Sequence, residues 1–282
     1  MINNYSKNLK KRLLKKQILP IIGVYDQFSA SIAAKEFEGV FCSGYGFSAS
    51  YYGLPDQGFI SWSDMISFVQ KMRNLIKNNH IIVDIDDGYN DDKIAANVCK
   101  NLELIGTSAV ILEDQKRPKK CGHLSGKEII PLDDYIKRLQ LIKSSTNDLF
   151  IIARTDSNNF KEGLERIVHY KNAGADALMI EGIENLSDIE RARERIGNNS
   201  FLVVNMISGG KTKNLSFSKL KELGVDLVIY STPCLFLAHK AIKNGLKDLK
   251  RNDGLFSNSN KGVSFEENLE MLENNLKGII DE

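Results

Sequence analysis

Short apolar runs alternate with longer segments of helical periodicity along most of this chain. The apolar runs end at Val24, Ser43, Asp84, Glu113, Arg154, Glu181, Asn205 and Tyr230. Between and after these runs, apolar residues recur at helical spacing over residues 27–37, 62–77, 91–105, 132–146, 159–173, 186–196, 216–223 and 233–250. Short continuous apolar runs are typical of strands buried on both faces, and strands that alternate with helices are typical of a parallel sheet.

Eight alternations of strand and helix predict a closed barrel. A (β/α)8 barrel of about 250 residues forms a single domain, and the pattern occupies residues 1–250. The five prolines fall in loops or at element boundaries, where no backbone N–H is needed: Pro20, Pro55, Pro118, Pro131 and Pro233. We therefore predict an α/β fold, a (β/α)8 TIM barrel with an N-terminal helix and a C-terminal helical extension.

The segment before the first strand, residues 4–18, predicts a basic amphipathic helix. Leucines at helical spacing form one face, while lysines and Arg12 occupy the others. Such a helix can bind membranes or acidic partners. A helix that covers one end of the barrel and keeps its lysines in water is the favoured interpretation.

The segment after the barrel, residues 251–282, predicts a polar linker followed by a helix. Ser264 and Glu267 form a capping-box pattern at the start of this helix. Its apolar stripe consists of Phe265, Leu269, Leu272, Leu276 and Ile279. A stripe of this kind must be buried, either against its own barrel or against a neighbouring subunit.

The composition narrows the classes of partner. With 282 residues and a net charge of +2, the chain has no basic excess that would indicate nucleic-acid binding. No apolar run approaches the roughly 18 residues of a membrane span, and the N-terminus lacks the apolar core of a signal peptide. The four cysteines are scattered without a CxxC pair, which favours a reducing, cytoplasmic location.

Carboxylates at adjacent strand ends are the first candidate for chemistry. Asp84 and Asp86 are two residues apart, so an extended strand directs both to one face, and Glu113 ends the next strand. Two bare carboxylates about 4 Å apart repel by roughly 4 kcal/mol at an effective dielectric constant of 20. Oxygen ligands of this type favour Mg²⁺. Ordinary solvated acids at strand ends are the alternative.

Cationic and glycine-rich positions stand at other strand ends. Arg154 can bind a carboxylate or phosphate in a bidentate manner, or it can form an internal ion pair with Glu113 or Glu181. Residues 43–46 read Ser-Gly-Tyr-Gly, which predicts flexible backbone whose N–H groups can receive an anion.

A cysteine lies in the long loop over residues 114–130. Cys121 follows Lys119 and Lys120, and nearby cations are expected to lower the pKa of its thiol. An accessible thiol can transfer a proton to or from a substrate. Cys121 and His123 could instead belong to a zinc site, but no CxxC or second histidine pair supports one.

Many ordered pieces of the chain resemble the isocitrate lyase/phosphoenolpyruvate mutase superfamily over residues 15–250. The resemblance implies a Mg²⁺-dependent enzyme, with Mn²⁺ as a substitute, that acts on small 2-oxo or 2-hydroxy acids through a pyruvate enolate. The matching pieces are Gly23–Ala30, Ser43–Ser50, Gly53–Asp56, Asp84–Tyr89, Leu112–Gln115, Lys120–His123, Ala153–Asp156 and Gly174–Asp176.

The resemblance also implies individual roles. Asp84 would bind the metal directly, Asp86 and Glu113 would hold metal-bound waters, and Asp56 would approach metal and substrate. The departing carbanion would receive its proton from Cys121. The residues implied to bind the carboxylic acid substrate are Ser43, Gly44, Tyr45, Gly122, His123, Arg154, Glu181 and Asn205.

Within this superfamily, a carbon–carbon lyase of the 2-methylisocitrate lyase type is the favoured prediction. A phosphonomutase that handles a C–P bond is the alternative, because the Lys-x-Cys-Gly-His motif also occurs in a carboxyphosphonoenolpyruvate mutase-like branch. A non-catalytic barrel is disfavoured by the intact acids. Asn90, Ser208 and Lys213 depart from the common pattern. The resemblance implies a homotetramer whose paired subunits exchange their C-terminal helices.

Overall fold

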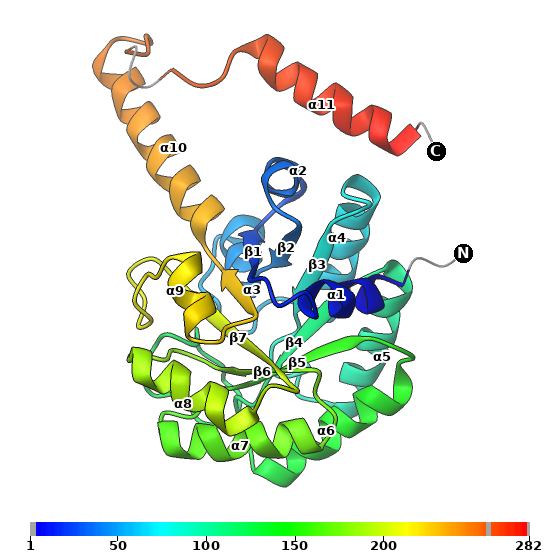
Figure 1. Ribbon diagram of the computed structural model, residues 1–282. Coiled ribbons are helices and arrows are strands. Elements are labelled where there is room, and N and C mark those ends of the chain that lie inside the picture. Colours follow the sequence, from blue (N-terminus) through cyan, green and yellow to red (C-terminus); the bar gives the residue numbers. More distant parts are fainter. Residues whose placement is uncertain (1–3, 258–260, 281–282) are drawn as a thin grey trace.

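The computed structural model describes residues 4–257 and 261–280, and its centre is a closed barrel of parallel strands (Figure 1). Each strand pairs with its sequence neighbours, and β8 closes the barrel against β1. The predicted (β/α)8 fold is confirmed. The strands are β1 (Leu19–Val24), β2 (Gly39–Cys42), β3 (His80–Asp84), β4 (Ala109–Glu113), β5 (Phe150–Thr155), β6 (Ala177–Ile180), β7 (Phe201–Met206) and β8 (Leu227–Tyr230).

Helices surround the barrel close to the predicted positions. Those that cover it are α2 (Gln27–Glu36), α4 (Trp62–Leu75), α5 (Asp92–Ile105), α6 (Leu132–Ser145), α7 (Phe160–Asn172), α8 (Leu186–Ile196) and α9 (Phe217–Glu222). Helix α10 (Pro233–Arg251) follows β8 and contacts β1. The expectation of a flexible glycine segment after β2 was wrong. Residues there form α3 (Gly44–Phe47) and the π-helix η1 (Ser48–Tyr52), because the Ser43 hydroxyl caps α3 by accepting from the Gly46 N–H at 3.2 Å.

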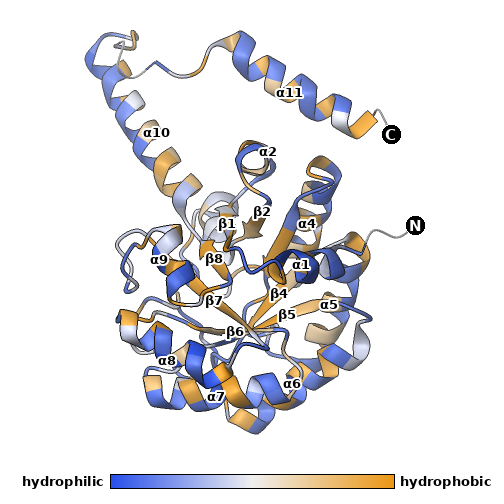
Figure 2. Ribbon diagram, viewed as in Figure 1, coloured by the Kyte–Doolittle hydropathy of each residue, from blue (hydrophilic) through white to orange (hydrophobic). Residues whose placement is uncertain are grey.

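Strand side chains alternate between two cores. Inward residues such as Ile82 and Ile111 form a cluster with other strand residues and with Leu9 and Leu13 of α1 (Tyr5–Leu13). Outward residues such as Val83 pack instead against the surrounding helices. The strands are accordingly apolar on both faces, and Figure 2 shows them as the most hydrophobic part of the molecule.

Helix α1 closes one end of the barrel, as favoured from the sequence. Leu9 and Leu13 are at most 1% exposed and complete the interior cluster. The Ser6 hydroxyl donates to the Ser108 carbonyl at 2.8 Å, and the guanidinium of Arg73 lies 3.8 Å from the centre of the Tyr5 ring. In the part of the chain that the structure describes, no helix is long and apolar enough to cross a membrane.

The C-terminal helices extend away from the barrel (Figure 1). Helix α10 leads outwards, and α11 (Phe265–Ile280) has no buried residue. Its nearest neighbours in its own chain are α2 and α4, and a groove of about 410 Å³ separates it from Phe28 and Ile32 of α2. The apolar stripe of α11 is therefore not covered by its own barrel.

The role of α1 can be tested by unfolding. We expect Leu9→Ala to lower the free energy of unfolding by about 2–5 kcal/mol, because it leaves a cavity at the end of the barrel core. Leu14, just beyond the same helix, is 62% exposed, so Leu14→Ala should change stability by no more than about 0.5 kcal/mol. Urea denaturation followed by circular dichroism measures both, and equal losses would contradict this role.

Candidate active site

The alternation of strand side chains places the polar residues at the mouth of the barrel. Asp84 follows Ile82 by two positions, as Glu113 follows Ile111, so each acid continues an inward-facing row. The same spacing directs other polar side chains to the carboxyl ends of the strands, where barrel enzymes bind their substrates. These are Ser43, Arg154, Glu181, Asn205 and Ser231.

Two adjoining spaces at this mouth both reach Cys121. The inner cavity has a volume of about 30 Å³, enough for a water molecule or two. Its polar lining includes Ser43, Tyr45, Asp56, Asp84, Cys121, Gly122, Arg154, Glu181, Asn205 and Ser231. The outer pocket, of about 540 Å³, shares Tyr45, Asp56 and Cys121 with the inner cavity and adds apolar residues such as Leu124 and Phe236. The β4–α6 loop, which carries Cys121, thus lies over the boundary between the two spaces.

Lys119 of this loop compensates the carboxylates on one side. Its side chain is 1% exposed, and its Nζ contacts Asp86 and lies 2.8 Å from Asp56 Oδ1. Burial alone would lower the pKa of Lys119, but the charges of Asp86, Glu113 and Asp56 hold it well above its ordinary value. The ammonium therefore stays charged among these acids.

Asp84, the last residue of β3, is held by the turn that follows the strand. Its Oδ1 accepts from the Asp86 N–H at 3.1 Å, and Asp86 has φ of +50°, a conformation that few residues other than glycine adopt. Burial and the neighbouring charge of Asp86 raise the pKa of Asp84 to about 7, against the opposing effects of Lys119 and Arg154. The pKa of the buried Glu113 is likewise held well above its ordinary value, mainly by burial.

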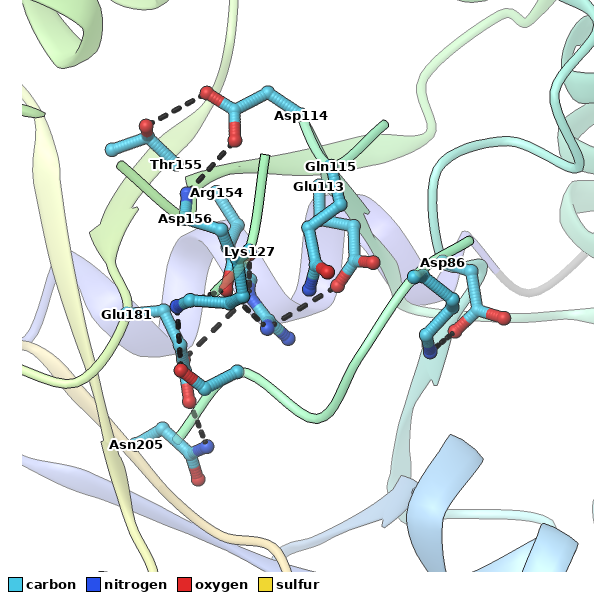
Figure 3. Close-up of polar contacts among 12 residues, drawn as sticks. Asp86, Glu113, Asp114, Gln115, Lys127, Arg154, Thr155, Asp156, Glu181 and Asn205 are labelled. Carbon is cyan, nitrogen blue, oxygen red and sulfur yellow. Dashed lines mark hydrogen bonds and ion pairs between the residues drawn. The ribbon is translucent and has the colours of Figure 1, made fainter. Parts of the chain in front are cut away.

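Arg154 compensates the carboxylates on the other side. Figure 3 shows it beside Glu113, Asp156 and Glu181, with Asp86 lying apart from this group. Arg154 nitrogens lie 3.2 Å from Glu113, 2.8 Å from Asp156 and 3.7 Å from Glu181. Both internal ion pairs that the sequence suggested for Arg154 are therefore present, and Asp156 adds a third.

The three acids predicted to surround one metal ion have separate partners. Among residues 4–257 and 261–280, no group of three histidine, cysteine, aspartate or glutamate side chains is arranged to hold a metal ion directly. A hydrated ion on Asp84 still fits. A Cβ built on Gly44 would stand only 3.0 Å from Asp84 Oδ2, so glycine leaves that oxygen uncovered, and the buried Glu113 Oε1 has no hydrogen-bond partner. Mg²⁺ often binds through one or two carboxylates and keeps several waters.

Glu181 is the centre of a second polar group. His123 Nδ1 accepts from the Lys211 N–H at 2.9 Å, which leaves the proton of a neutral ring on Nε2, 2.9 Å from Glu181 Oε1. Asn205 donates to the same oxygen at 2.8 Å. Burial would raise the pKa of Glu181, but Arg154, His123 and Asn205 together hold it well below its ordinary value. Glu181 is thus a fixed anion.

The environment of Cys121 differs from the sequence-based expectation. We expected the adjacent lysines to lower its pKa, but burial is the largest influence and raises it. Lys119 points to the acids, and Lys120 Nζ donates to the Gly126 carbonyl at 2.9 Å instead. The thiol therefore stays protonated at neutral pH, as a proton donor requires.

Close backbone contacts hold Cys121 in place. The Gln115 side chain forms two hydrogen bonds of 2.9 Å with the backbone of Lys120. A Cβ on Gly122 would stand 2.3 Å from Arg154 Nη2, so only glycine lets the loop approach this closely. The loop conformation thus depends on contacts on both sides of Cys121.

Several residues of the site were missed from the sequence or were given other roles. Lys119 was considered only for its effect on Cys121, and neither Lys127 nor Ser231 was selected. Ser231 donates to Asn205 Oδ1 at 2.6 Å and continues the inward row of β8. This spacing from Ile229 could have identified Ser231, whereas nothing in the local sequence indicates which acids the lysines reach.

Comparisons with known proteins give the family. Residues 9–250 match the family profile described as phosphoenolpyruvate phosphomutase. The chain is 31% identical over 270 residues to 2,3-dimethylmalate lyase of Eubacterium barkeri, with 94% of this chain and 92% of that protein covered. It is 33% identical over 266 residues to the chloroplastic carboxyvinyl-carboxyphosphonate phosphorylmutase of Arabidopsis thaliana, with 91% and 78% covered. It is 30% identical over 267 residues to 2-methylisocitrate lyase of Bacillus subtilis, with 88% and 86% covered.

Solved structures agree with this assignment. A crystal structure of 2,3-dimethylmalate lyase superposes with a TM-score of 0.92 at 27% identity, covering 98% of this chain and 95% of that one. Oxaloacetate acetylhydrolase in complex with 3,3-difluorooxalacetate gives 0.91 at 26% identity, covering 97% and 95%. The fold and these relatives define a (β/α)8-barrel enzyme. The chain belongs to the isocitrate lyase/phosphoenolpyruvate mutase superfamily, as its motifs predicted, and its relatives are lyases and mutases.

Asp114, next to Glu113, supports the site without facing the cavity. It accepts hydrogen bonds from the Thr155 hydroxyl at 2.7 Å, from the Asp156 N–H at 2.8 Å, from Tyr170 at 2.6 Å and from Arg166 at 3.1 Å. Figure 3 shows how the first two contacts fix the end of β5, from which Arg154 projects.

This supporting role predicts a stability effect. Asp114→Asn should lower the free energy of unfolding by about 3 kcal/mol, because it removes the charge that faces the buried Arg166 and places an amide group among donors. Asp134→Asn is the matched control, since Asp134 forms an exposed pair with Lys137 and should cost no more than about 1 kcal/mol. Chemical denaturation tests both, and a similar small effect for the two variants would refute the role.

Proposed function

We propose that this protein is a Mg²⁺-dependent carbon–carbon lyase for a small 2-hydroxy or 2-oxo di- or tricarboxylic acid. The observation that carries the proposal is the position of the Cys121 thiol, which lines the same inner cavity as Asp84 and Arg154. A proton donor, a carboxylate for a metal and a cation for a substrate acid thus meet at one place. The similarity to 2,3-dimethylmalate lyase and 2-methylisocitrate lyase supports this reaction class.

The proposed substrate contacts follow from the lining of the inner cavity. The first N–H groups of α3, at Gly44 and Tyr45, have no intrahelical partner and can bind one carboxylate together with Ser43. Arg154 would hold the other end of the acid. Glu181, Asn205, Gly122 and His123 would contact the remaining polar groups of the substrate.

The metal would be held directly by Asp84, with Asp86 and Glu113 bound to it through waters and Asp56 nearby. When bound, Mg²⁺ or Mn²⁺ would stabilise negative charge on the substrate oxygen next to the breaking bond, an effect worth several kcal/mol.

The protein's own contribution would be a proton and a closed site. As the carbon–carbon bond breaks, its electron pair stays with the departing acid, and the substrate hydroxyl on the other side gives its proton to Asp56 and becomes a carbonyl. That proton would later restore the thiol. Cys121 would then transfer its Sγ proton to the carbanion carbon. The closed loop would exclude water, which would otherwise compete as a proton donor.

A phosphonomutase is the second candidate. The specific observation in its favour is the 33% identity to the Arabidopsis carboxyvinyl-carboxyphosphonate phosphorylmutase. In that reaction a C–P bond would form or break at the same cavity, and Arg154 would face a phosphonate in place of a carboxylate.

A product screen separates the two functions. The purified protein is incubated with Mg²⁺ and a panel of hydroxy-diacids, hydroxy-triacids, oxaloacetate and phosphonopyruvate, and the products are followed by NMR. We expect a 2-oxo acid such as pyruvate together with a second acid, and no turnover in EDTA until Mg²⁺ or Mn²⁺ is restored. Movement of the ³¹P signal between C–P and O–P would favour the mutase, and full activity with EDTA would refute the metal dependence.

The proton donor predicts both a rate and a pH effect. On the substrate that the screen identifies, Cys121→Ser should lower kcat about 10²- to 10⁴-fold with a smaller change in substrate binding, because a hydroxyl is a far weaker acid. Since burial raises the thiol pKa, the wild-type rate at saturating Mg²⁺, which would keep Asp84 ionised, should be flat through neutral pH and fall only in alkaline solution, as the thiol loses its proton. That alkaline decrease should be absent in Cys121→Ser. Wild-type turnover by the variant would exclude Cys121 as the acid.

We also propose that the enzyme works in the cytoplasm as a homotetramer whose paired subunits exchange their C-terminal helices. The four cysteines are free, as in a reducing compartment. The exposed apolar residues of α10 and α11 support the assembly, because burying each large side chain is worth about 1.5–3 kcal/mol before entropy costs. They are Leu237, Ile242, Leu246, Phe265, Leu269, Leu272, Leu276 and Ile279.

Truncation tests the assembly. Light scattering at micromolar concentration should show a tetramer for the full chain, and a smaller species for a chain that ends at Asp253 and so lacks α11. A monodisperse monomer for the full chain would end this proposal, and an unchanged tetramer after truncation would exclude α11 from the interface.

A further inference from the structure

Lys127 is a buried cation of the β4–α6 loop that has no role in the proposed reaction and was not predicted from the sequence to belong to the site. Its side chain is 2% exposed, although the residue belongs to a loop that runs over the surface. Its Nζ donates to the Gly122 carbonyl at 2.5 Å and lies 2.8 Å from Asp156 Oδ1. A buried ammonium is costly unless each partner is close, so these two contacts determine its position.

The two partners of Lys127 belong to different parts of the site. Gly122 directly follows Cys121 in the loop, whereas Asp156 stands at the end of β5 and contacts Arg154 at 2.8 Å. Asn158, just after β5, also donates to the Lys127 carbonyl at 2.9 Å. Lys127 therefore joins the segment that carries the thiol to the carboxylate that orients the arginine.

Other lysines of the loop cannot replace this connection. Lys120 donates only to Gly126 within the loop, and Lys116 forms a pair with Glu128 in which both side chains are more than half exposed. Lys119 reaches Asp56 and Asp86, on the other side of the cavity. Among the described residues of the loop, Lys127 alone connects the backbone next to Cys121 to β5.

We propose that Lys127 is a positioning residue that latches the β4–α6 loop closed and sets the Cys121 thiol against the substrate held by Arg154. The latch rests on the contacts alone. Its effect on proton transfer rests on the proposed function. Without Lys127, the Gly122 carbonyl would lose its buried donor, and the loop would open to return that carbonyl to water.

Thiol labelling measures the latch without any substrate. Wild type and Lys127→Met are treated with iodoacetamide at one mildly alkaline pH, and labelling of each cysteine is followed by mass spectrometry of its peptide. Labelling of Cys121 should be about 10- to 100-fold faster in Lys127→Met, the change that corresponds to the loss of a charge-assisted hydrogen bond. Removal of a nearby positive charge by itself would raise the pKa of the Cys121 thiol, reduce the fraction of reactive thiolate and slow the labelling. Faster labelling therefore reports opening of the loop and not the change in charge.

The chain supplies its own controls. Cys42 and Cys99 are fully buried, so their labelling reports global unfolding. Lys116→Met removes a lysine of the same loop that forms only an exposed pair, and should leave the labelling of Cys121 unchanged. If Cys42, Cys99 and Cys121 are labelled at the same rate in Lys127→Met, that variant has unfolded globally. Lys127→Gln is then labelled in the same way, and the rates for its three cysteines are compared. Unchanged labelling of Cys121, or labelling that never precedes that of Cys42 in either variant, would overturn the latch.

Kinetics on the identified substrate test the positioning role. Lys127→Met should lower kcat about 10- to 100-fold with little change in KM, and Lys127→Arg, which keeps a donor and a charge, should recover part of the loss. Normal kcat together with faster labelling would overturn the positioning role. If no acid is turned over even by wild type, but the labelling behaves as stated, the proposed function fails and the latch stands.

Discussion

Charge compensation between the β4–α6 loop and the strand ends is the constraint on which the site depends. Asp84 and Glu113 end adjacent strands and Asp86 lies in the turn after β3, close enough that the charge of Asp86 raises the pKa of both other acids. Lys119 reaches two acids from the loop, and Arg154 reaches three from β5. Because one of these two cations belongs to the loop, the position of the loop over the barrel and the compensation of the acids depend on each other.

The position of the loop over the barrel also explains why two residues near the site must be glycine. Gly122 lies against Arg154, and Gly44 lies against Asp84, so in each case backbone meets a charged group directly. Such contacts narrow the inner cavity to about 30 Å³, next to the outer pocket of about 540 Å³. A protonated thiol in that cavity is suited to deliver a proton to a carbanion that must not meet solvent.

The sequence predicted the fold well because a barrel repeats one local pattern. Apolar runs, helical periodicity and polar strand ends each reported the same architecture, and the predicted helices of the barrel lie within two residues of the observed ones. The inward rows also explain why Asp84, Arg154 and Asn205 could be selected. The contacts of the β4–α6 loop were harder to predict from the sequence. The partners of Lys119 and Lys127, apart from Gly122, lie 29 or more residues away along the chain. The pKa of Cys121 was predicted in the wrong direction since burial, which depends on the folded loop, outweighs adjacent lysines.

Hydrogen exchange of the loop tests this account most directly. If ion pairs to the strand-end acids hold the loop closed, Lys119→Met should make the backbone amides of residues 116–128 exchange about 10- to 100-fold faster. The amides of β4 should remain as protected as in wild type, which shows that the barrel is intact. Unchanged exchange in residues 116–128, with the lysine removed and the barrel folded, would contradict the claim that charge compensation closes the site.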